Sequence, residues 1–385
     1  MNEILILGAG YAGMTVALGV AARTRGHDVH ITLVNPQDRF TERLRLHQTA
    51  SGQELKNLWI PRMLDGTGVE FARGWVTAID ADTRTVRVDD ERTLHYDTLV
   101  YALGSVADTE TVPGVEDHAY TLNSMRDAQQ LATRLRQLGG GTVVVGGGGL
   151  TGVESAAEIA EQHPQLKVML IGRQEPGSMM GPKARTYLLD GLARLGVQVR
   201  SGVDIAKVLP DAVELVGGEH VPANAVLWTT GVRVSPLAAT AGLEVDDRGR
   251  IITDATLRSV SHPDIYAVGD AAAARQNYGV IHGTCHSGIP TAAHAAASIV
   301  RELRGKQPKP FRFAYLHQPV SLGRHDGVIQ FTHPDDTPSR FFLTGRSAVA
   351  YKETVSSSTW PTYRLIKVFP GVVIWRRGGR ATRTA

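Results

Sequence analysis

The chain has 385 residues, of which 42% are hydrophobic and 21% are charged, and its formal net charge is +3 at pH 7. This composition is typical of a globular protein with about two or three domains, and the charge is too small to indicate a nucleic acid as partner. The single cysteine, Cys285, excludes an intramolecular disulfide and a dithiol redox cycle within the chain.

The apolar runs of the chain are short. The first of them begins near Ile4, so we expect no signal peptide. None approaches the roughly 20 apolar residues that span a bilayer. We therefore expect a cytoplasmic protein in a reducing compartment.

The beginning of the chain follows a strand–turn–helix–strand pattern. Residues 4–7 and 29–34 are apolar runs of strand length, and the stretch between them is rich in Ala, Val and Leu. The turn is a GxGxxG motif, whose glycines allow a tight turn, a close approach to a pyrophosphate and close helix packing. The following helix offers free N–H groups and a partial positive charge to phosphates. The residues that we expect at the dinucleotide here are Gly8, Gly10, Ala12 and Gly13.

The next segments bear on the same nucleotide. Asn35 stands where such folds usually carry an acid for ribose hydroxyls, and its amide can still donate and accept there. Residues 39–48 are dense in cations and have two interpretations, a solvated helix or a segment that faces the cofactor. Residues 69–88 alternate as a strand hairpin does, and residues 95–105 predict a strand that ends in a Gly turn.

The opening unit then recurs. Residues 142–145 predict a strand, Gly-Gly-Gly-Leu-Thr-Gly over 147–152 is a second GxGxxG, and a helix over 153–162 and a strand over 166–171 follow. Two such motifs predict two dinucleotides, which indicates a flavoprotein that passes a hydride from a nicotinamide to a flavin. The residues that we assign to the second nucleotide are Gly147, Gly149, Thr151 and Gly152.

The order of the motifs along the chain indicates more than any single motif does. The first GxGxxG, the run Tyr-Asp-Thr-Leu-Val-Tyr-Ala-Leu-Gly over 96–104, the second GxGxxG and Val-Gly-Asp over 268–270 resemble the pyridine nucleotide–disulfide oxidoreductase superfamily. Residues 149–154, with no CxxxxC pair, resemble its type II NADH:quinone oxidoreductase branch and the apoptosis-inducing-factor-like relatives. The resemblance covers about residues 1–310 and is loose beyond them.

The resemblance implies an α/β fold with two Rossmann-like dinucleotide-binding domains and a small C-terminal α+β domain. An FAD-binding domain would take residues 1–112 and 245–307, an NAD(P)H-binding domain 113–244, and an acceptor or interface domain 308–385. Asp270 would then bind the FAD ribityl chain, although it could instead cap a helix over 271–274. Further cofactor-binding positions that the resemblance implies are Asn35, Arg43, Val76, Ala102, Gly104, Gly231, Gly269 and Pro290.

The choice between NADH and NADPH depends on the end of the second unit. Ile171 is followed by Gly172 and Arg173 rather than by the acid that would accept from a 2′-hydroxyl. An arginine beside a missing acid accommodates a 2′-phosphate, so we predict a preference for NADPH. The alternative is that Arg173 is a solvated turn residue.

Three positioning residues follow from the resemblance. Glu154 resembles the family's Glu beside the nicotinamide, and its alternative role is to complement the helix dipole in the first turn. His47 could relay a proton near the flavin, with Arg43 and Arg45 stabilising the reduced anion, unless the segment is a surface helix. Lys352 resembles a family lysine near the far face of the flavin. Hydride transfer needs no acid or base, so we expect no nucleophile.

A segment rich in histidine precedes the helix that we predict over residues 291–304, whose N-terminus would face the flavin in this family. The spacing of its histidines with Cys285 matches no usual zinc pattern, so we expect no metal. We interpret Cys285 as a packing residue rather than a reactive thiol. The histidines concerned are His282, His286 and His294.

The last part of the chain is the least informative. After a linker over 305–310, residues 320–332 predict a strand pair around Gly327. From Thr354 onward there are six basic residues and no acids, which suits either an anionic membrane surface or a C-terminal strand with a basic tail. The sequence leaves open whether the chain forms a homodimer.

The predicted function is transfer of electrons from NADPH or NADH through FAD to a quinone-like acceptor. One alternative is a flavin-dependent oxidoreductase for a specialised metabolite or a redox partner protein. Another is a redox-sensing interaction protein like the apoptosis-inducing relatives. The sequence does not name the acceptor.

Overall fold

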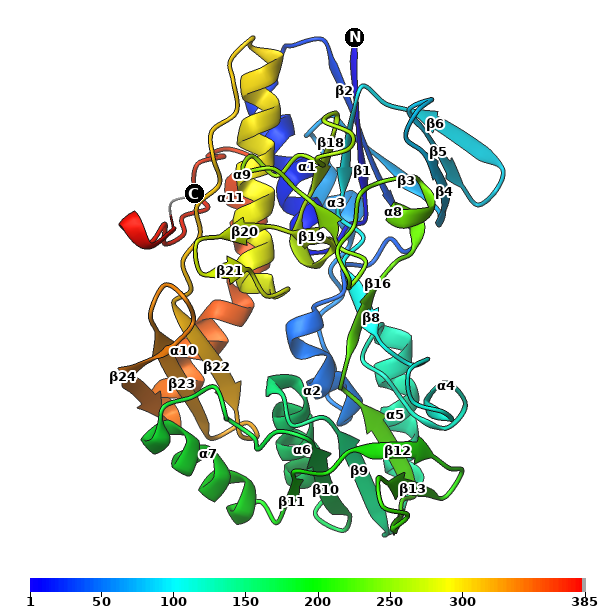
Figure 1. The fold of residues 1–385 in the computed structure, drawn as a ribbon, viewed down its shortest axis with the longest axis vertical. Coiled ribbons are helices and arrows are strands. Elements are labelled where there is room, and N and C mark those ends of the chain that lie inside the picture. The colour runs from blue at the N-terminus through cyan, green and yellow to red at the C-terminus, as the bar shows by residue number, and fades with distance from the viewer. Residues whose placement is uncertain (383–385) are drawn as a thin grey trace.

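The structure, a computed structural model, describes residues 1–382. Two helix-covered parallel sheets make up most of it, one in the upper and one in the lower half of Figure 1. The small C-terminal sheet and α10 lie beside the lower half, and the short helix α2 (Leu46–Ala50) lies between the halves. The predicted mixed α/β class is confirmed.

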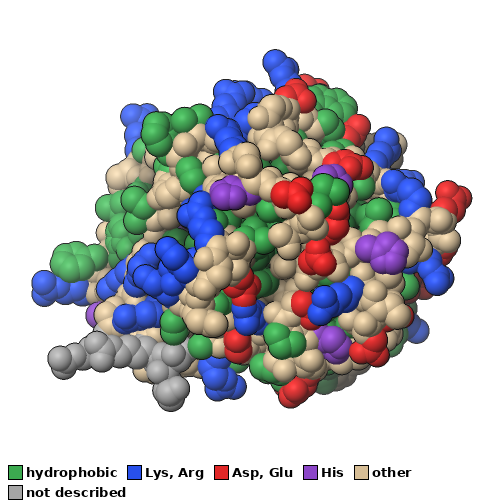
Figure 2. Space-filling view, turned by 90° about the horizontal axis from the view of Figure 1, so that it is seen from above, with side chains coloured by type: hydrophobic (Ala, Val, Ile, Leu, Met, Phe, Trp, Pro, Cys, Tyr) green, Lys and Arg blue, Asp and Glu red, His purple; other side chains and the backbone are tan. Residues whose placement is uncertain are grey.

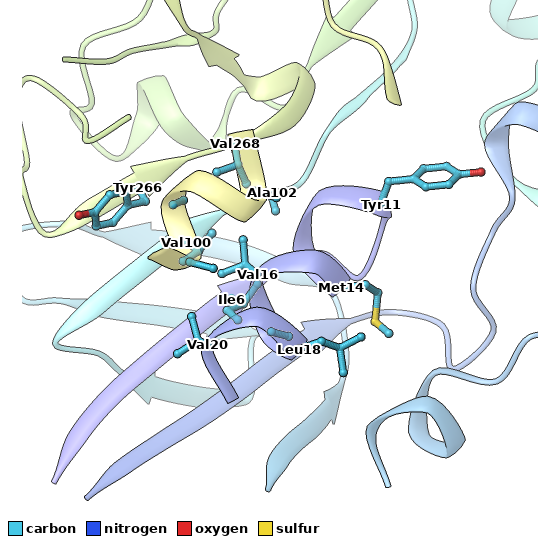
Figure 3. Packing of buried hydrophobic residues seen from close by; sticks show 14 of the residues in the cluster. Ile6, Tyr11, Met14, Val16, Leu18, Val20, Val100, Ala102, Tyr266 and Val268 are labelled. Atoms are coloured by element: carbon cyan, nitrogen blue, oxygen red, sulfur yellow. The ribbon is translucent and has the colours of Figure 1, made fainter. Parts of the chain in front are cut away.

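The upper sheet has five parallel strands in the order β18-β7-β1-β2-β3. Both of its faces are covered, which is why its strands are continuous apolar runs. Figure 3 shows Ile6, Val16, Val20 and Val100 of this core packed together. The elements are β1 (Asn2–Leu7), α1 (Tyr11–Arg23), β2 (Val29–Asn35), β3 (Val69–Arg73), β7 (Thr98–Tyr101), β18 (Ile265–Ala267) and α9 (Cys285–Leu303).

The lower sheet has four parallel strands in the order β11-β10-β9-β15. Its first strand, helix and second strand repeat the pattern of β1, α1 and β2, so the predicted second unit is confirmed. The elements are α5 (Met125–Gln137), β9 (Thr142–Gly146), α6 (Leu150–Gln162), β10 (Lys167–Gly172), α7 (Pro182–Arg194), β11 (Gln198–Ser201) and β15 (Ala225–Trp228).

Smaller elements complete these two halves. The hairpin predicted within residues 69–88 is present as β4 and β5, which pair antiparallel, while β3 belongs to the upper sheet. The antiparallel pair β8 and β16 joins the halves. The strands are β4 (Val76–Asp80), β5 (Thr85–Val88), β6 (Arg92–His95), β8 (Ser105–Ala107), β12 (Ile205–Val208), β13 (Ala212–Leu215), β14 (His220–Pro222), β16 (Val232–Val234), β17 (Ile251–Ile252), β19 (Ala272–Ala273), β20 (Arg275–Gln276) and β21 (Gly279–Val280). The short helices and 3₁₀ turns are η1 (Arg43–Arg45), α3 (Ile60–Leu64), α4 (Val115–His118), α8 (Leu237–Thr240), η2 (Gly269–Ala271) and η3 (Gly379–Thr382).

The C-terminal part differs from the sequence-based expectation in two places. The strand pair turns at residues 322–326, and Gly327 begins the second strand, opposite Ser321, instead of forming the turn. The expected C-terminal strand is wrong because residues 359–366 are helical. Tyr363 and Ile366, three residues apart, are buried on one face of that helix, which is the helical period. The elements are β22 (His317–Ser321), β23 (Gly327–Thr332), β24 (Pro338–Thr344), α10 (Gly345–Ser357) and α11 (Thr359–Ile366).

Two helix starts also differ. Helix α9 begins at Cys285 rather than at residue 291, because Thr284 and Ser287 form a capping box. Pro290 then lies inside the helix and supplies no N–H for the carbonyl of His286. Asp270 does not cap a helix over 271–274, since η2 leads directly into strand β19.

Candidate functional site

The first glycine loop has the geometry of a phosphate cradle. Gly8 has a φ of +94° and donates its N–H to the carbonyl of Val34 at 2.8 Å. A Cβ added at Gly13 would lie 1.7 Å from the Gly8 oxygen, so only glycine lets α1 pack so closely. At Gly10 an added Cβ would meet no atom of residues 1–382 within 4 Å. The loop is therefore tight on its inner side and open at Gly10, which fits the diphosphate of FAD.

Asn35 holds this loop in place. Its Oδ1 accepts from Ala9 N at 2.9 Å, and its Nδ2 donates to the Gln37 carbonyl at 2.6 Å. A carboxylate could make the first bond but not the second. Asn35 thus has a backbone role at the position where an acid is usual, and its contact with a ribose stays a prediction.

Asp270 lies at the carboxyl edge of the upper sheet, where the segments that contain Arg43, Ser105 and Gly283 come together. Its Oδ2 accepts from Ser105 Oγ at 2.7 Å, and the Ser105 carbonyl accepts from Arg43 Nη1 at 2.5 Å. A Cβ added at Gly283, just before α9, would lie 3.0 Å from Asp270. Ligands of open α/β sheets bind at this edge, so the arrangement fits a flavin held between the loops.

The other positions predicted for FAD lie as follows. Ala102 packs close to the first glycine loop: a Cβ added at Gly8 would lie 2.6 Å from its carbonyl oxygen. Ala12 packs close to Gly269, where an added Cβ would lie 3.3 Å from the Ala12 Cβ. Gly104 has a φ of +69° and open space around it. The remaining three are Val76, the first residue of β4, opposite Val88; Pro290, buried inside α9; and Gly231, with a φ of +71° beside Asp108.

The second glycine loop repeats the first. Gly147 N donates to the Ile171 carbonyl at 2.7 Å, and a Cβ at Gly152 would lie 1.9 Å from the Gly147 oxygen. Gly149 is open, since an added Cβ there would have no atom of the described residues within 4 Å. Thr151 is exposed at the second position of α6. This loop therefore fits a second dinucleotide.

The end of β10 explains the missing acid. A Cβ at Gly172 would lie 2.7 Å from Gly148 N, so a side chain there would collide with the second glycine loop. The next residue, Arg173, is 80% exposed, and its Nε lies 3.1 Å from both carboxylate oxygens of Asp204. The Arg173 guanidinium is thus paired with Asp204 and largely open to solvent.

The three predicted positioning residues meet in one buried cluster. The Glu154 carboxylate on α6 accepts from Ser321 N at 2.9 Å and from Ser321 Oγ at 3.2 Å, and it is ion-paired with Lys352 of α10. Lys352 Nζ also donates to Ser321 Oγ at 3.2 Å. His47 Nδ1 on α2 lies 3.9 Å from the second Glu154 oxygen. Segments far apart in the sequence thus converge on Glu154.

Burial controls the charge of this cluster. His47 is 3% exposed, and its Nε2 has no hydrogen-bond partner among the residues that the structure describes. Burial, together with Lys352, holds the pKa of His47 well below its usual range, so the imidazole is neutral at pH 7. Burial also lowers the pKa of Lys352 to about 7. All five residues of α2 are buried, so the surface-helix interpretation is wrong there.

Glu154 does not complement the helix dipole in the first turn of α6. The helix starts at Leu150, and its first turn holds no acidic residue. Glu154 is the fifth residue, on a buried face that points at the C-terminal sheet. Its carboxylate is instead satisfied by the partners in β22 and α10.

A second carboxylate was missed by the sequence-based reasoning. Glu158 is fully buried on α6, accepts from Gln53 Nε2, and has Arg324 Nε at 3.9 Å. Burial raises its pKa to about 7. The spacing of Glu154 and Glu158, four residues apart on an apolar helix, was the available signal, since such residues share one face.

The cluster lies close to an open pocket. Arg45 of η1 is ion-paired with Glu353 of α10, and Arg324 Nη2 lies 3.7 Å from the same carboxylate. Arg45 and Glu353 line a cavity of about 960 Å³ between residues 54–63 and helices α10 and α11, with Trp59 and Trp360 on its walls. A ligand of moderate size can therefore come near the buried cluster from this side.

The histidines near α9 have separate surroundings. The His282 ring packs on Tyr315, the His286 ring on His317, and His294 Nε2 bonds the Lys309 carbonyl at 2.8 Å. Burial raises the pKa of the Cys285 thiol to about 12, so it stays protonated. Within residues 1–382, no three His, Cys, Asp or Glu side chains gather as metal ligands would.

The sequence matches the family described as pyridine nucleotide-disulphide oxidoreductase over residues 2–298. The chain belongs to this family. It is accordingly an oxidoreductase with FAD and NADH or NADPH as its cofactors, and the two glycine loops fit that pair. None of the helices over residues 1–382 combines the length and hydropathy that a bilayer-spanning helix requires.

Individual relatives cover nearly the whole chain. An NADH dehydrogenase-like protein of Mycobacterium tuberculosis is 32% identical over 355 residues, 85% of this chain and 87% of its own length. A demethylphylloquinone reductase of Synechocystis is 29% identical, covering 94% of this chain and 93% of its own. Among solved structures, the sulfide:quinone oxidoreductase of Aquifex aeolicus aligns with a TM-score of 0.83 over 96% of this chain and 93% of its own, at 18% identity. That identity supports the fold alone.

Proposed function

We propose that this oxidoreductase takes a hydride from NADPH or NADH and passes the electrons to a quinone. The observation that carries the proposal is the buried cluster of Glu154, Lys352 and His47, which lies where both halves and the C-terminal sheet meet. The name of the Synechocystis relative supports a quinone as the acceptor. We also propose the domain division given above, with the acceptor handled by residues 308–385.

The roles of the chain's own residues follow from their charge. The bound flavin supplies a separate electron store, so the two substrates can react in turn. Lys352, with a pKa of about 7, can hold or release a proton at neutral pH. Glu154 and Ser321 orient that ammonium group, and His47 stays neutral beside them because burial and Lys352 hold its pKa well below the usual range. Together they stabilise negative charge that develops nearby.

Anaerobic stopped-flow spectroscopy tests this proposal. NADPH or NADH should bleach the flavin of the purified holoprotein, and the naphthoquinone menadione should restore its colour over many turnovers. Fast bleaching without recovery by quinones would contradict the quinone proposal and favour another acceptor. A long-lived nicotinamide–flavin complex without turnover would indicate a redox sensor instead.

The preference for NADPH, which remains a proposal, has its own test at Arg173. Arg173→Ala should lower kcat/KM for NADPH by at least about tenfold and leave kcat/KM for NADH nearly unchanged, because a hydrogen bond between charged groups is lost. Arg200→Ala is the matched control, since Arg200 on the neighbouring strand is bound to Glu219 at 2.7 Å. A wild-type enzyme that favours NADH by tenfold or more would contradict the assignment.

We propose that the C-terminal apolar patch, defined by Leu365, Val368, Phe369 and Ile374, touches an anionic membrane. These side chains are exposed. Arg25 donates to the Lys367 carbonyl and Arg23 to the Pro370 carbonyl, so two cations bind the same segment. Figure 2, seen from above relative to Figure 1, shows Lys and Arg side chains gathered beside apolar ones on its left side. Apolar groups flanked by cations suit a membrane surface.

Vesicle sedimentation tests the patch. The wild-type protein should sediment with phosphatidylglycerol vesicles at low salt and less at high salt, because surface charges are screened. The double change Phe369→Asp and Ile374→Asp should abolish sedimentation. Val216→Asp alters an equally exposed side chain elsewhere and should leave it unchanged. Equal sedimentation of all three proteins would contradict the proposal. Membrane contact through this patch does not require a homodimer.

A further inference from the structure

Two imidazoles meet where the C-terminal sheet packs against α9. His286 lies in the first turn of α9 and His317 at the start of β22, and their ring centres are 4.8 Å apart. The hydroxyl of Tyr351 on α10 lies 2.7 Å from His317 Nδ1, and the two rings are perpendicular. Three separate elements thus contribute to one arrangement that the function described above does not use.

The surroundings of this pair are aromatic. The His286 ring lies 5.5 Å from Phe313 and 6.4 Å from Tyr315, and Phe331 packs edge-on against Tyr351 at 5.7 Å. Burial lowers the pKa of both histidines to about 4, so both rings are neutral at pH 7. Uncharged and aromatic side chains of this kind suit contact with a flat, uncharged molecule.

The pair also has free hydrogen-bonding atoms. Among the residues that the structure describes, neither ring nitrogen of His286 has a protein partner, and His317 is bonded only through Nδ1. These nitrogens are not fully buried, whereas Nε2 of His47 is fully buried without a hydrogen-bond partner among the described residues. Partly buried groups that stay unpaired but accessible are available to a ligand.

We propose that His286 and His317 bind the carbonyl oxygen of the electron acceptor and that Tyr351 and His317 deliver a proton to it. This inference rests on the proposed function and assigns the acceptor a class, a planar carbonyl compound such as a quinone. Lys352, the next residue of α10, belongs to the Glu154 cluster, so one helix contributes a residue to each set of groups.

The proton transfer balances as follows. The acceptor gains two electrons and one proton as a hydride equivalent from the flavin. The oxygen that the two histidines bind takes the Nε2 proton of His317, while His317 Nδ1 takes the phenol proton of Tyr351. Tyr351 is only partly buried and regains a proton from water. The acceptor is thereby reduced to the hydroquinone. His317 then holds its proton on Nδ1, and it regains the starting tautomer by taking a proton from water at Nε2 and releasing the Nδ1 proton to water.

The experiment uses holoprotein with menadione as the probe. Tyr351→Phe removes one oxygen atom and should keep the menadione dissociation constant within about twofold while slowing flavin reoxidation about tenfold or more, with a changed solvent deuterium isotope effect. His317→Phe should slow reoxidation about 100-fold and weaken menadione binding, measured by quenching of flavin fluorescence. Reduction of the flavin by NADPH should match the wild type in both variants.

His294→Phe is the matched control. His294 is also a buried imidazole on α9 with its pKa lowered to about 4, but it bonds the Lys309 carbonyl. Its change should leave reoxidation and the isotope effect unaltered. Wild-type reoxidation rates and isotope effects in both Tyr351→Phe and His317→Phe would overturn the relay. A wild-type protein that menadione never reoxidises would instead overturn the proposed function. Melting temperature and flavin content identify a variant that fails to fold, and Tyr351→Phe, which alters no packing, then decides.

Discussion

Lys352→Met should be among the most damaging single changes in this protein. It leaves the Glu154 carboxylate buried beside Ser321 without its cation, and breaking one side of a buried ion pair costs about 3–5 kcal/mol of unfolding free energy. Flavin reoxidation by menadione should fall about 100-fold, as expected when a proton-holding group is lost. Flavin reduction by NADPH should change little. Denaturant unfolding and stopped-flow absorbance measure the two effects.

The pH dependence of reoxidation provides a second measurement of the same residue. Because burial lowers the pKa of Lys352 to about 7, the ammonium group is present below pH 7 and is lost as the pH rises above it. Wild-type reoxidation should therefore slow above pH 7, and this limb should be absent in Lys352→Met.

Two further variants separate stability from chemistry. The double change Glu154→Gln and Lys352→Met removes both charges, so it should recover most of the stability but not the reoxidation rate. Lys207→Met removes an exposed lysine and should have no effect. Wild-type reoxidation rates with an unchanged pH profile in Lys352→Met would contradict the role of this lysine.

Gly13→Ala should yield a protein without flavin. The added Cβ would lie 1.7 Å from the Gly8 carbonyl oxygen, which forces α1 away from the glycine loop. Overpacking of this kind costs about 3 kcal/mol or more, and the loop would lose the shape that receives the diphosphate. Visible absorbance of the purified protein reports flavin content, and thermal melting reports the stability of the apoprotein.

Gly10→Ala is the informative partner of that variant. Gly10 has a φ of −74°, which alanine adopts freely, and an added Cβ has no neighbour within 4 Å in the part of the chain that the structure describes. The apoprotein should therefore melt as the wild type does. The flavin should nevertheless bind at least about tenfold more weakly, because the methyl group occupies the space where the backbone approaches the phosphates. Equal flavin affinity of Gly10→Ala and wild type would remove this loop from the FAD site.

Much of the fold was predictable because its pattern is local. The two glycine motifs with their flanking strands predicted both parallel sheets, since hydrophobic periodicity and turn residues can be recognised within a short stretch of sequence. The start of α9 was missed because Pro290 reads as a helix boundary, whereas the capping box of Thr284 and Ser287 placed the start earlier. The C-terminal helix α11 was missed because its aromatic residues also suit a strand.

The candidate site was predictable only in part. His47, Glu154 and Lys352 were named one by one from the resemblance, but no spacing in the sequence indicates that they share one cluster. Ser321, which binds both Glu154 and Lys352, gives no signal, because it is an ordinary serine on a strand whose position depends on tertiary packing. The pairing of His286 with His317 is equally non-local.

The order of the strands in the upper sheet affects how the protein is made. Strand β18 and Asp270 come from residues beyond 264, yet they complete a sheet that begins at Asn2. During synthesis the upper sheet therefore stays incomplete, with one edge of β7 uncovered, until more than two thirds of the polypeptide has left the ribosome. Stalled nascent chains released before β18 should retain no coenzyme, whereas chains extended past α9 should capture it during synthesis.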